Sequence, residues 1–418
     1  MRHVIIGGSI AGISAAKSIR GRYRDADITM ISSEDAKPYY RPMVSALIER
    51  NDVDLGLGDP VADYGVRPVH DSVTGLDARS REVSLASGKR LYYDKLLIAT
   101  GSRPVIPEIH GIQGPGVFAL RTMDDALAIQ SAARKKKHAV VLGGGFVGIK
   151  AAIALRRLGL QVTIIEKLDR VLYEKTDKSG SRIVAELLKK EGIEIATNQE
   201  EYEVLREGAT LRSVMLASGR IIDADLIVLA VGTRPNTEPF IGSGMKVHKG
   251  IVIRASLETS LPNVYAAGDV VEYRDVVLNT SAVSASWPNA EEMGRLAGLN
   301  MTGANIAYNG FLSLMTTVDI LGARVTTIGL VDTANAGYEV FTEGGERNYR
   351  KLVFKKDVLV GALFIGLDAE SDMYAYLIKN QVPLGTLKAM AIKNTLAESG
   401  LVGSHAVPFR DQPVQVET

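Results

Sequence analysis

HVIIGGSIAG, residues 3–12, begins the chain with a short apolar run that leads into a glycine-rich turn. Residues 9–23 follow with small side chains on one face, which is typical of a packed helix, and residues 27–34, DITMISSE, form a second apolar run. Strand, turn, helix and strand in this order predict a βαβ unit of a parallel sheet.

A second copy of this pattern starts near Ala139. Residues 139–145 read AVVLGGG, residues 146–159 read FVGIKAAIALRRLG, and residues 161–167 read QVTIIEK. Because each βαβ unit with a glycine turn can hold one nucleotide, two copies predict two nucleotide sites.

Each copy is interrupted by a strand-rich stretch. Residues 71–97 alternate short polar and apolar segments around Gly75 and Gly88, and residues 197–229 have a similar character, so both predict antiparallel strands. Each stretch ends on an apolar strand and a glycine turn, LLIATGSRP at 96–104 and LIVLAVGTRPN at 226–236. The repeat is therefore one of whole domains.

After Val318 the pattern changes to that of an antiparallel sheet with helices, and the polar stretch 404–418 is expected to dock as a tail on this chain or on a neighbour. The predicted fold class is α/β, with two Rossmann-like dinucleotide-binding domains, inserted antiparallel strands and a C-terminal α+β interface domain. The predicted domains are a first dinucleotide-binding domain at 1–115 and 241–317, a second dinucleotide-binding domain at 116–240, and the interface domain with its tail at 318–418.

Composition excludes several classes of protein. The 418 residues include no cysteine, which removes disulfides, thiol nucleophiles and cysteine-ligated iron–sulfur clusters, and no metal site is expected. A net charge of +1 makes nucleic acid an unexpected partner, and no apolar run approaches the roughly 18 residues that cross a membrane. Since the first strand starts at His3, no leader is expected, and the predicted location is cytoplasmic.

The first glycine turn has the features of a dinucleotide fingerprint. Gly7 permits the tight turn, Ser9 is small enough for the backbone to approach a pyrophosphate, and Gly12 allows close packing of helix on strand. Glu34 lies 22 residues beyond Gly12, where a carboxylate can accept hydrogen bonds from a ribose. The same turn also resembles a hydrolase nucleophile elbow, but the six scattered histidines offer no partner in an evident loop.

The second turn, at Gly143, Gly145 and Gly148, is a complete GxGxxG. Glu166 follows at the end of the next strand, and a carboxylate there favours NADH over NADPH because it repels a 2′-phosphate. Lys167 and Arg170 oppose that preference. The turn is not a P-loop, because Lys150 is followed by alanine rather than by serine or threonine.

Further motifs join these turns into a family pattern. They are YRP at 40–42, ATGSRP at 99–104, GTRPN at 232–236 and VYAAGD at 264–269. With the two glycine turns, they resemble the flavoproteins of the pyridine nucleotide-disulfide oxidoreductase superfamily over nearly the whole chain. Within it, the chain is most similar to the cysteine-independent branch of rubredoxin reductases, ferredoxin reductases and the flavin domain of NADH nitrite reductases.

The resemblance implies that both cofactors bind through residues of these motifs. The FAD ligands that it implies are Gly7, Ser9, Ile10, Ala11, Gly12, Glu34, Arg41, Pro42, Val73, Ala99, Thr100, Gly101, Arg103, Gly268 and Asp269. The NAD ligands that it implies are Gly143, Gly145, Phe146, Val147, Gly148, Glu166 and Gly232. Among the first set, Asp269 is expected at the flavin ribitol and the backbone of Val73 at the adenine.

Two departures from the family pattern bear on the chemistry. The stretch RPMVSAL at 41–47 lacks the redox cysteine of disulfide reductases and of related oxidases, so electrons must leave the flavin directly. Ferredoxin reductases usually carry a lysine and a glutamate where this chain has Ala46 and Lys150. We hypothesise that Lys150 restores the missing positive charge beside the flavin and is the candidate catalytic residue, although a lysine facing solvent or a phosphate is an equal alternative. Trp287, the only tryptophan, is expected either at the flavin edge or in the core.

The expected function is an FAD-dependent, NADH-linked oxidoreductase that exchanges hydride between NAD(H) and FAD. The expected partner is a separate iron–sulfur or rubredoxin-type protein, met transiently or as a subunit of a hetero-oligomer. Two alternatives remain open at this point: an NADH oxidase that makes hydrogen peroxide, and a redox-sensing flavoprotein that acts by binding a partner.

Overall fold

The computed structural model describes residues 1–50, 52–333, 337–367 and 371–396. By their contacts these residues form two compact units, of which unit 1 comprises 1–40, 55–103 and 234–313, and unit 2 comprises 41–54, 104–233 and the residues from 314 onward. The predicted tail at 404–418 lies outside the described residues. The predicted boundaries of the three domains stay predictions.

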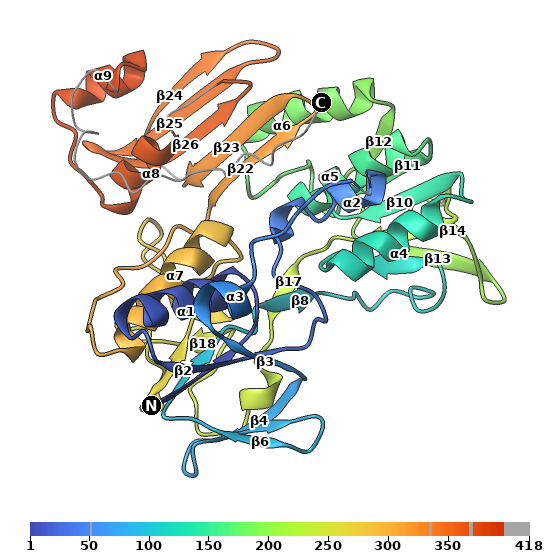
Figure 1. The fold of residues 1–418 in the computed structure, drawn as a ribbon. Coiled ribbons are helices and arrows are strands. Elements are labelled where there is room, and N and C mark those ends of the chain that lie inside the picture. The colour runs from blue at the N-terminus through green and yellow to red at the C-terminus, as the bar shows by residue number, and fades with distance from the viewer. Residues whose placement is uncertain (51, 334–336, 368–370, 397–418) are drawn as a thin grey trace. The chain divides into compact units, whose positions relative to one another are not determined.

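Unit 1 is built on a parallel sheet of five strands in the order β19-β7-β1-β2-β3 (Figure 1). The strands are β1 Arg2–Ile6, β2 Asp27–Ser32, β3 Arg67–His70, β7 Lys95–Ile98 and β19 Val264–Ala266. The three central strands β1, β2 and β7 are almost entirely buried, as the apolar runs in the sequence predict for a parallel sheet covered on both faces.

Two helices pack together beside this sheet, α1 Ile10–Arg22 and α7 Trp287–Met301. Their backbones approach so closely that a Cβ built on Gly294 would lie 2.1 Å from the carbonyl oxygen of Ala11, and one on Gly298 would lie 2.5 Å from that of Ala15. Only glycine fits at such a crossing. Unit 1 also contains α3 Pro60–Tyr64, η2 Glu238–Phe240, β18 Ile251–Val252, β20 Val271–Arg274 and β21 Ser281–Val283.

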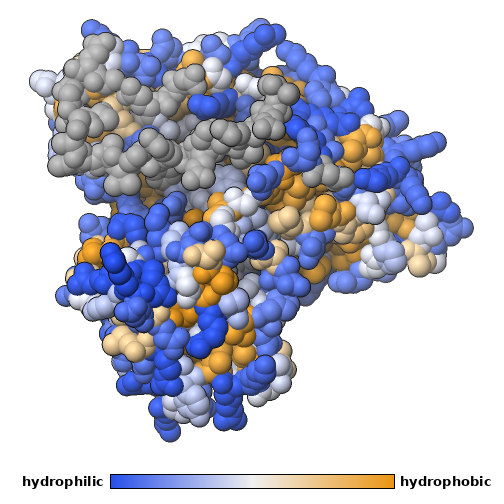
Figure 2. Space-filling model, in the orientation of Figure 1, coloured by the Kyte–Doolittle hydropathy of each residue, from blue (hydrophilic) through white to orange (hydrophobic). Residues whose placement is uncertain are grey.

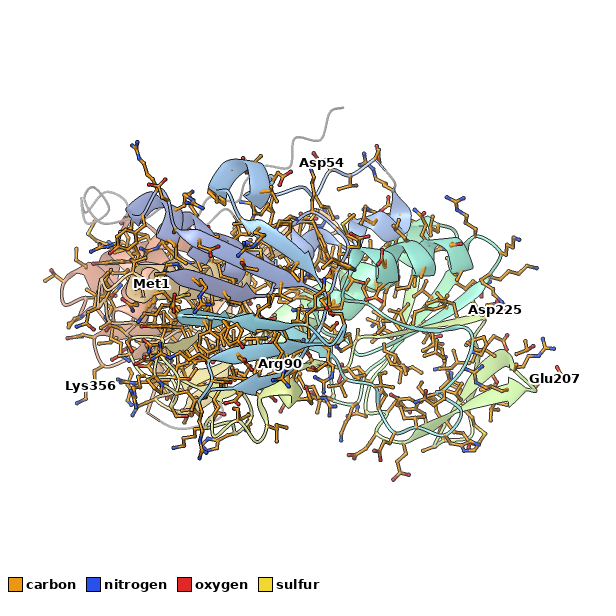
Figure 3. The ribbon with its side chains drawn as sticks, turned by 60° about the horizontal axis from the view of Figure 1, so that its bottom comes forward. Met1, Asp54, Arg90, Glu207, Asp225 and Lys356 are labelled. Atoms are coloured by element: carbon orange, nitrogen blue, oxygen red, sulfur yellow. The ribbon has the colours of Figure 1, made fainter. Side chains whose placement is uncertain are left out.

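The predicted antiparallel strands are present in unit 1 as a three-stranded sheet, β4 Val73–Asp77, β5 Glu82–Leu85 and β6 Arg90–Tyr92. Figure 3 labels Arg90 on β6, at the open edge of this sheet. Val83 and Leu85 are buried in the same hydrophobic cluster as β1 and β7, so the inserted sheet closes the core of the unit.

Unit 2 repeats this plan with a second parallel sheet, in the order β12-β11-β10-β16-β9. Its strands are β9 Val117–Ala119, β10 His138–Leu142, β11 Gln161–Ile165, β12 Ile193–Ala196 and β16 Leu226–Leu229, and its helices are α4 Met123–Ala133, α5 Phe146–Arg157 and α6 Lys178–Lys190. The inserted antiparallel strands are β13 Tyr202–Glu207, β14 Thr210–Leu216 and β15 Ile221–Asp223. Figure 3 shows Glu207 at the tip of the β13–β14 hairpin.

Unit 2 also contains the C-terminal antiparallel sheet, in the order β22-β23-β26-β25-β24. Its elements are β22 Met315–Ile320, β23 Ala323–Gly329, β24 Glu339–Gly344, β25 Tyr349–Lys355, β26 Val358–Ile365, α8 Ser371–Lys379 and α9 Leu387–Lys393. Two parallel Rossmann-like sheets with small antiparallel sheets and a C-terminal antiparallel sheet confirm the predicted fold class.

The segment 41–54 belongs to unit 2 although it is flanked in sequence by unit 1. It contains η1 Arg41–Met43 and α2 Ala46–Glu49. The Gln130 side chain of α4 donates to the Leu47 carbonyl at 3.0 Å, and Arg157 of α5 pairs with Glu49 at 3.1 Å. These contacts attach the segment to the second nucleotide fold.

The chain passes between the units at β8 Ser102–Pro104 and β17 Thr233–Pro235. On the face drawn in Figure 2, hydrophobic residues gather over the part of unit 2 that carries α2 and α4, where Leu127 is 41% exposed. None of the helices in the described part of the chain is both long and apolar enough to cross a membrane.

Candidate functional site

The first glycine turn lies at the carboxyl end of β1, where it contacts the ends of the neighbouring strands β2 and β7. The Gly7 N–H donates to the Ile31 carbonyl of β2 at 2.8 Å, and a Cβ on Gly7 would lie 2.1 Å from the Ala99 carbonyl oxygen beyond β7. A Cβ on Gly12 would lie 2.0 Å from the Gly7 carbonyl oxygen. The turn is therefore pressed against both β7 and α1, at the switch point where α/β sheets bind ligands.

The start of α1 is open to a ligand. Ser9 is the N-cap residue in an extended conformation, and in the described part of the chain its side chain makes no capping hydrogen bond. The first turn, which includes Ile10 and Ala11, contains no acidic residue. Backbone N–H groups at such a helix start have no partner within the helix, and the helix dipole favours an anion there. This end fits a pyrophosphate.

Asp269 approaches the same place from the end of β19. Gly268 has φ +81, and a Cβ on it would lie 3.3 Å from the Ala11 side chain of α1 and 3.5 Å from the Ala290 side chain of α7. The Asp269 carboxylate accepts from the Ser102 hydroxyl at 3.0 Å. The GD pair therefore lies where the N-terminal turns of two helices meet.

A short network orders the loop after β7. The Thr100 hydroxyl donates to the Asn236 carbonyl at 2.8 Å, the Asn236 amide donates to the Thr100 carbonyl at 2.9 Å, and the Asn236 N–H donates to the Gly101 carbonyl at 3.0 Å. Arg103 donates to the Asn236 side-chain oxygen at 2.9 Å and pairs with Glu238. The predicted ligands Thr100, Gly101 and Arg103 are thus fixed in place by Asn236, a residue that the sequence motif contains but that we did not predict as a site residue.

Glu34 follows β2, as expected for a ribose ligand. The buried Tyr39 donates its hydroxyl to the Glu34 carboxylate at 2.5 Å. An ionised carboxylate can accept several hydrogen bonds, so this contact orients Glu34 and leaves it able to accept others. Tyr39 is a supporting residue that no motif in the sequence identified.

Some of the other predicted residues of the first site belong to unit 1 and some belong to unit 2. Val73 begins β4 and pairs with Leu85 in unit 1. Arg41 and Pro42 lie in η1 of unit 2, where Arg41 donates to the Arg121 carbonyl at 3.2 Å. Trp287 is half-buried at the start of α7, and its ring meets the ring of Tyr40 edge to face, with centroids 4.9 Å apart.

The second glycine turn reproduces the geometry of the first. The Gly143 N–H donates to the Ile165 carbonyl of β11 at 2.8 Å, and a Cβ on Gly143 would lie 2.3 Å from the Ala230 carbonyl oxygen beyond β16. A Cβ on Gly148 would lie 2.0 Å from the Gly143 carbonyl oxygen. Gly145 caps α5, and a Cβ on it would meet no described atom within 4 Å. The backbone at the start of α5 is therefore open to a ligand.

Glu166 is held by the turn itself. Its carboxylate accepts from the Gly144 N–H at 2.6 Å and from the Leu168 N–H at 2.9 Å. Glu166 also acts on the half-buried Tyr202, where burial and then this carboxylate raise the pKa to about 12. The two nearby cations have acidic partners: Lys167 pairs with Glu200 at 2.6 Å, and Arg170 pairs with both Asp169 and Asp332.

Exposed apolar side chains come from three segments around the second turn. They are Val147 on α5, Leu168 and Tyr173 after β11, and Val231 after β16, which are between 37% and 50% exposed. Phe146 is half-buried at the start of α5, and Gly232 has φ +108 with an exposed backbone. Apolar surface and open backbone at a helix start suit a ligand with flat rings and phosphates.

Lys150 lies one turn into α5 and is half-buried. Its ammonium donates to the Met43 sulfur at 3.6 Å, and no carboxylate of the described residues lies within 4 Å of it. Burial lowers the pKa of Lys150, and Asp319 only partly offsets this shift. A buried amine with a thioether as its partner is poorly compensated within the protein.

Both turns therefore fit dinucleotides: each has a backbone too close for any side chain, an open helix start and an acidic residue at the next strand end. In the described residues, no three or more histidine or acidic side chains are grouped as a metal site would require.

Comparison with known proteins agrees with this geometry. A family model described as pyridine nucleotide-disulphide oxidoreductase matches residues 1–294. The NADH-dependent phenylglyoxylate dehydrogenase subunit epsilon of Aromatoleum evansii is 30% identical over 410 residues, which cover 95% of this chain and 96% of that protein. The NADH-rubredoxin oxidoreductase of Clostridium acetobutylicum is 29% identical over 368 residues, 87% of this chain and 90% of that protein.

Among solved structures, the ferredoxin reductase for the CYP199A2 system from Rhodopseudomonas palustris matches with a TM-score of 0.81 and 27% identity, over 88% of this chain and 91% of that one. Some other curated relatives are longer, and the chain spans 46% to 49% of their length.

The Tyr39–Glu34 contact gives a test of the first site. Replacement Tyr39→Phe removes the hydroxyl that orients the Glu34 carboxylate, and we expect dinucleotide binding at this site to weaken about 2- to 10-fold. The measurement is the dissociation constant of FAD from the fluorescence of released flavin. Tyr93→Phe, which alters another buried tyrosine of unit 1, is the control and should leave FAD binding unchanged. Equal FAD affinities in all three proteins would contradict a role for the Tyr39–Glu34 contact in FAD binding.

Proposed function

The chain belongs to the pyridine nucleotide-disulphide oxidoreductase family of FAD-dependent NAD(P)H oxidoreductases. From that premise we propose that it exchanges hydride between NADH and FAD. We propose that it also exchanges electrons with a separate iron–sulfur or rubredoxin-type protein. The observation that carries the proposal is the combination of two equivalent glycine turns with a chain that has no cysteine. Two dinucleotides can bind, but no thiol can relay electrons between them and a disulfide.

We assign FAD to the turn at Gly7–Gly12 and NAD(H) to the turn at Gly143–Gly148. The flavin would supply the chemistry, because it can take a hydride from nicotinamide and release electrons singly. The protein's part is to bind and orient: α1 faces one pyrophosphate, α5 faces the other, and Glu34 and Glu166 accept from the two riboses. Asp269, held by Ser102, would accept a hydrogen bond from the ribitol chain.

The surroundings of Glu166 support a preference for NADH. A 2′-phosphate would place negative charge beside this carboxylate. Lys167 and Arg170 could have relieved that repulsion, but Glu200, Asp169 and Asp332 already pair with them. The 2′-phosphate of NADPH would therefore have to break an existing ion pair before it could pair with Lys167 or Arg170.

The nature of two relatives supports the proposed partner. One is a subunit of a dehydrogenase and one is a rubredoxin oxidoreductase. Since a chain without cysteine cannot hold a cysteine-ligated cluster, the cluster or iron site must lie on another polypeptide. We propose a cytoplasmic electron-transfer protein or the NAD-handling subunit of a hetero-oligomer.

We propose Lys150 as the residue that places positive charge near the flavin. Its ammonium touches Met43, which follows Arg41 and Pro42, two of the proposed flavin ligands. Because the half-buried amine has no carboxylate of the described residues within 4 Å, it is available to a bound ligand. A cation beside the flavin favours its reduced form.

Anaerobic stopped-flow reduction tests the proposed function. We expect NADH to bleach the flavin band of the purified protein faster than NADPH does, and we expect reoxidation by rubredoxin, by ferredoxin or by a co-purifying iron–sulfur subunit. Rapid reoxidation by oxygen alone, with formation of hydrogen peroxide, would instead indicate an oxidase. No reduction by NADH or NADPH would contradict the proposal and favour a sensing flavoprotein.

A pair of variants tests Lys150. Lys150→Met removes the charge, and we expect the flavin midpoint potential to fall by roughly 30 mV, which corresponds to a tenfold change in a two-electron equilibrium. Lys150→Arg keeps the charge and should retain most of the potential. Spectroelectrochemical titration measures both values. An unchanged potential in Lys150→Met would exclude the proposed role.

A further inference from the structure

The segment between β11 and α6, residues 166–177, is attached to two different parts of unit 2; we call it the ribose loop. At its start it is joined to the second glycine turn, because Glu166 accepts from the Gly144 N–H and the Leu172 N–H donates to the Gly144 carbonyl at 2.9 Å. Whatever fixes this loop therefore fixes the carboxylate at the start of α5.

At its other end the ribose loop is held by the C-terminal sheet. The Thr327 hydroxyl of β23 donates to the Lys175 carbonyl at 2.7 Å, and Thr327 is fully buried. Tyr349 and Lys351 of β25 both donate to one oxygen of the Asp177 carboxylate, at 2.7 Å and 2.9 Å.

Asp177 is the centre of this attachment. It is the N-cap of α6 and accepts from the Gly180 N–H at 2.9 Å. Burial by itself would raise the pKa of Asp177, but the hydrogen bonds from Gly180, Lys351 and Tyr349 outweigh it and lower the pKa. Asp177 therefore remains ionised at neutral pH, and it joins the end of the loop, the start of α6 and the C-terminal sheet.

The middle of the loop has a third attachment to the segment that follows β23. Arg170, whose side chain is 10% exposed, pairs with Asp332 beyond β23 at 2.6 Å. A Cβ on Gly180 would lie 3.0 Å from Ile365 and 3.1 Å from Leu363, so the first turn of α6 packs directly on β26. The polar contacts reach the loop at Arg170, Lys175 and Asp177, and those made by Asp177 are buried.

We infer that the C-terminal sheet is a positioning element for the pyridine nucleotide site, because Thr327, Tyr349 and Lys351 hold the ribose loop and thereby orient Glu166. The inference rests on the proposed function, in which the second turn binds NADH. The hydrogen bonds of these three residues to the loop go to Lys175 and Asp177, so we expect them to act on the site through the ribose loop. Binding couplings are reciprocal, so a bound nucleotide should in turn stabilise the attachment of the sheet.

Adjacent threonines of β23 offer a matched test. Thr326 and Thr327 are both buried, but the Thr326 hydroxyl lies 3.1 Å from the Thr317 hydroxyl within the sheet, whereas only Thr327 reaches the ribose loop. We expect Thr327→Val to weaken NADH binding about 3- to 10-fold with FAD content unchanged. Thr326→Val should leave NADH affinity unchanged, and Thr327→Ser, which keeps the hydroxyl, should restore it.

Hydrogen exchange of residues 166–177 in the flavin-loaded protein provides a second readout, and Tyr349→Phe a second variant. The inference predicts faster exchange of the ribose loop in Thr327→Val and Tyr349→Phe than in Thr326→Val. Equal NADH affinity and equal exchange in Thr327→Val and Thr326→Val would overturn the inference and leave the proposed function intact. Failure of the unmutated protein to bind NADH would overturn the proposed function and this inference together.

Discussion

The close approach of backbone to backbone at the two glycine turns is the constraint on which the structure depends. At Gly12 and Gly148 a single methyl group would lie 2.0 Å from a carbonyl oxygen of the same turn, which is far inside van der Waals contact. This approach brings the start of each helix to the end of each central strand. The proposed phosphate sites at the two helix starts depend on this approach.

The absence of cysteine limits the chemistry that a chain with two such turns can perform. Without cysteine the chain cannot form a thiol relay to a disulfide, and under the proposed function it exchanges electrons with a separate protein instead. In unit 2 the C-terminal sheet contacts the ribose loop through Asp177 and Lys175. Under the proposed function, the sheet is therefore part of the framework of the second site.

The sequence predicted those features that depend on local pattern. The turns at Gly7 and Gly143, the strand ends at Glu34 and Glu166 and the two inserted antiparallel sheets could be located because period, spacing and glycine position are local properties. The fold class was confirmed for the same reason. The roles of the site residues stay predictions, although the structure brings Gly7, Gly12, Ala99, Gly268 and Asp269 close together.

Contacts between distant segments could not be predicted. Tyr39 supports Glu34, Ser102 supports Asp269, and Tyr349 contacts Asp177 across 172 positions of the sequence. A lone tyrosine or serine has no signature that identifies such a partner. The assignment of 41–54 to unit 2 was also beyond the sequence, since it arises from side-chain contacts with α4 and α5.

Separate occupancy of the two turns is the central claim, and paired binding titrations of Gly12→Ala and Gly148→Ala test it most directly. The account predicts that folded Gly148→Ala protein retains one FAD per chain and loses NADH binding, because its added methyl group disturbs only the turn at the start of α5. Gly12→Ala should lose FAD. Loss of FAD from Gly148→Ala, or full retention of FAD by Gly12→Ala, would contradict the assignment of the two cofactors to these two turns.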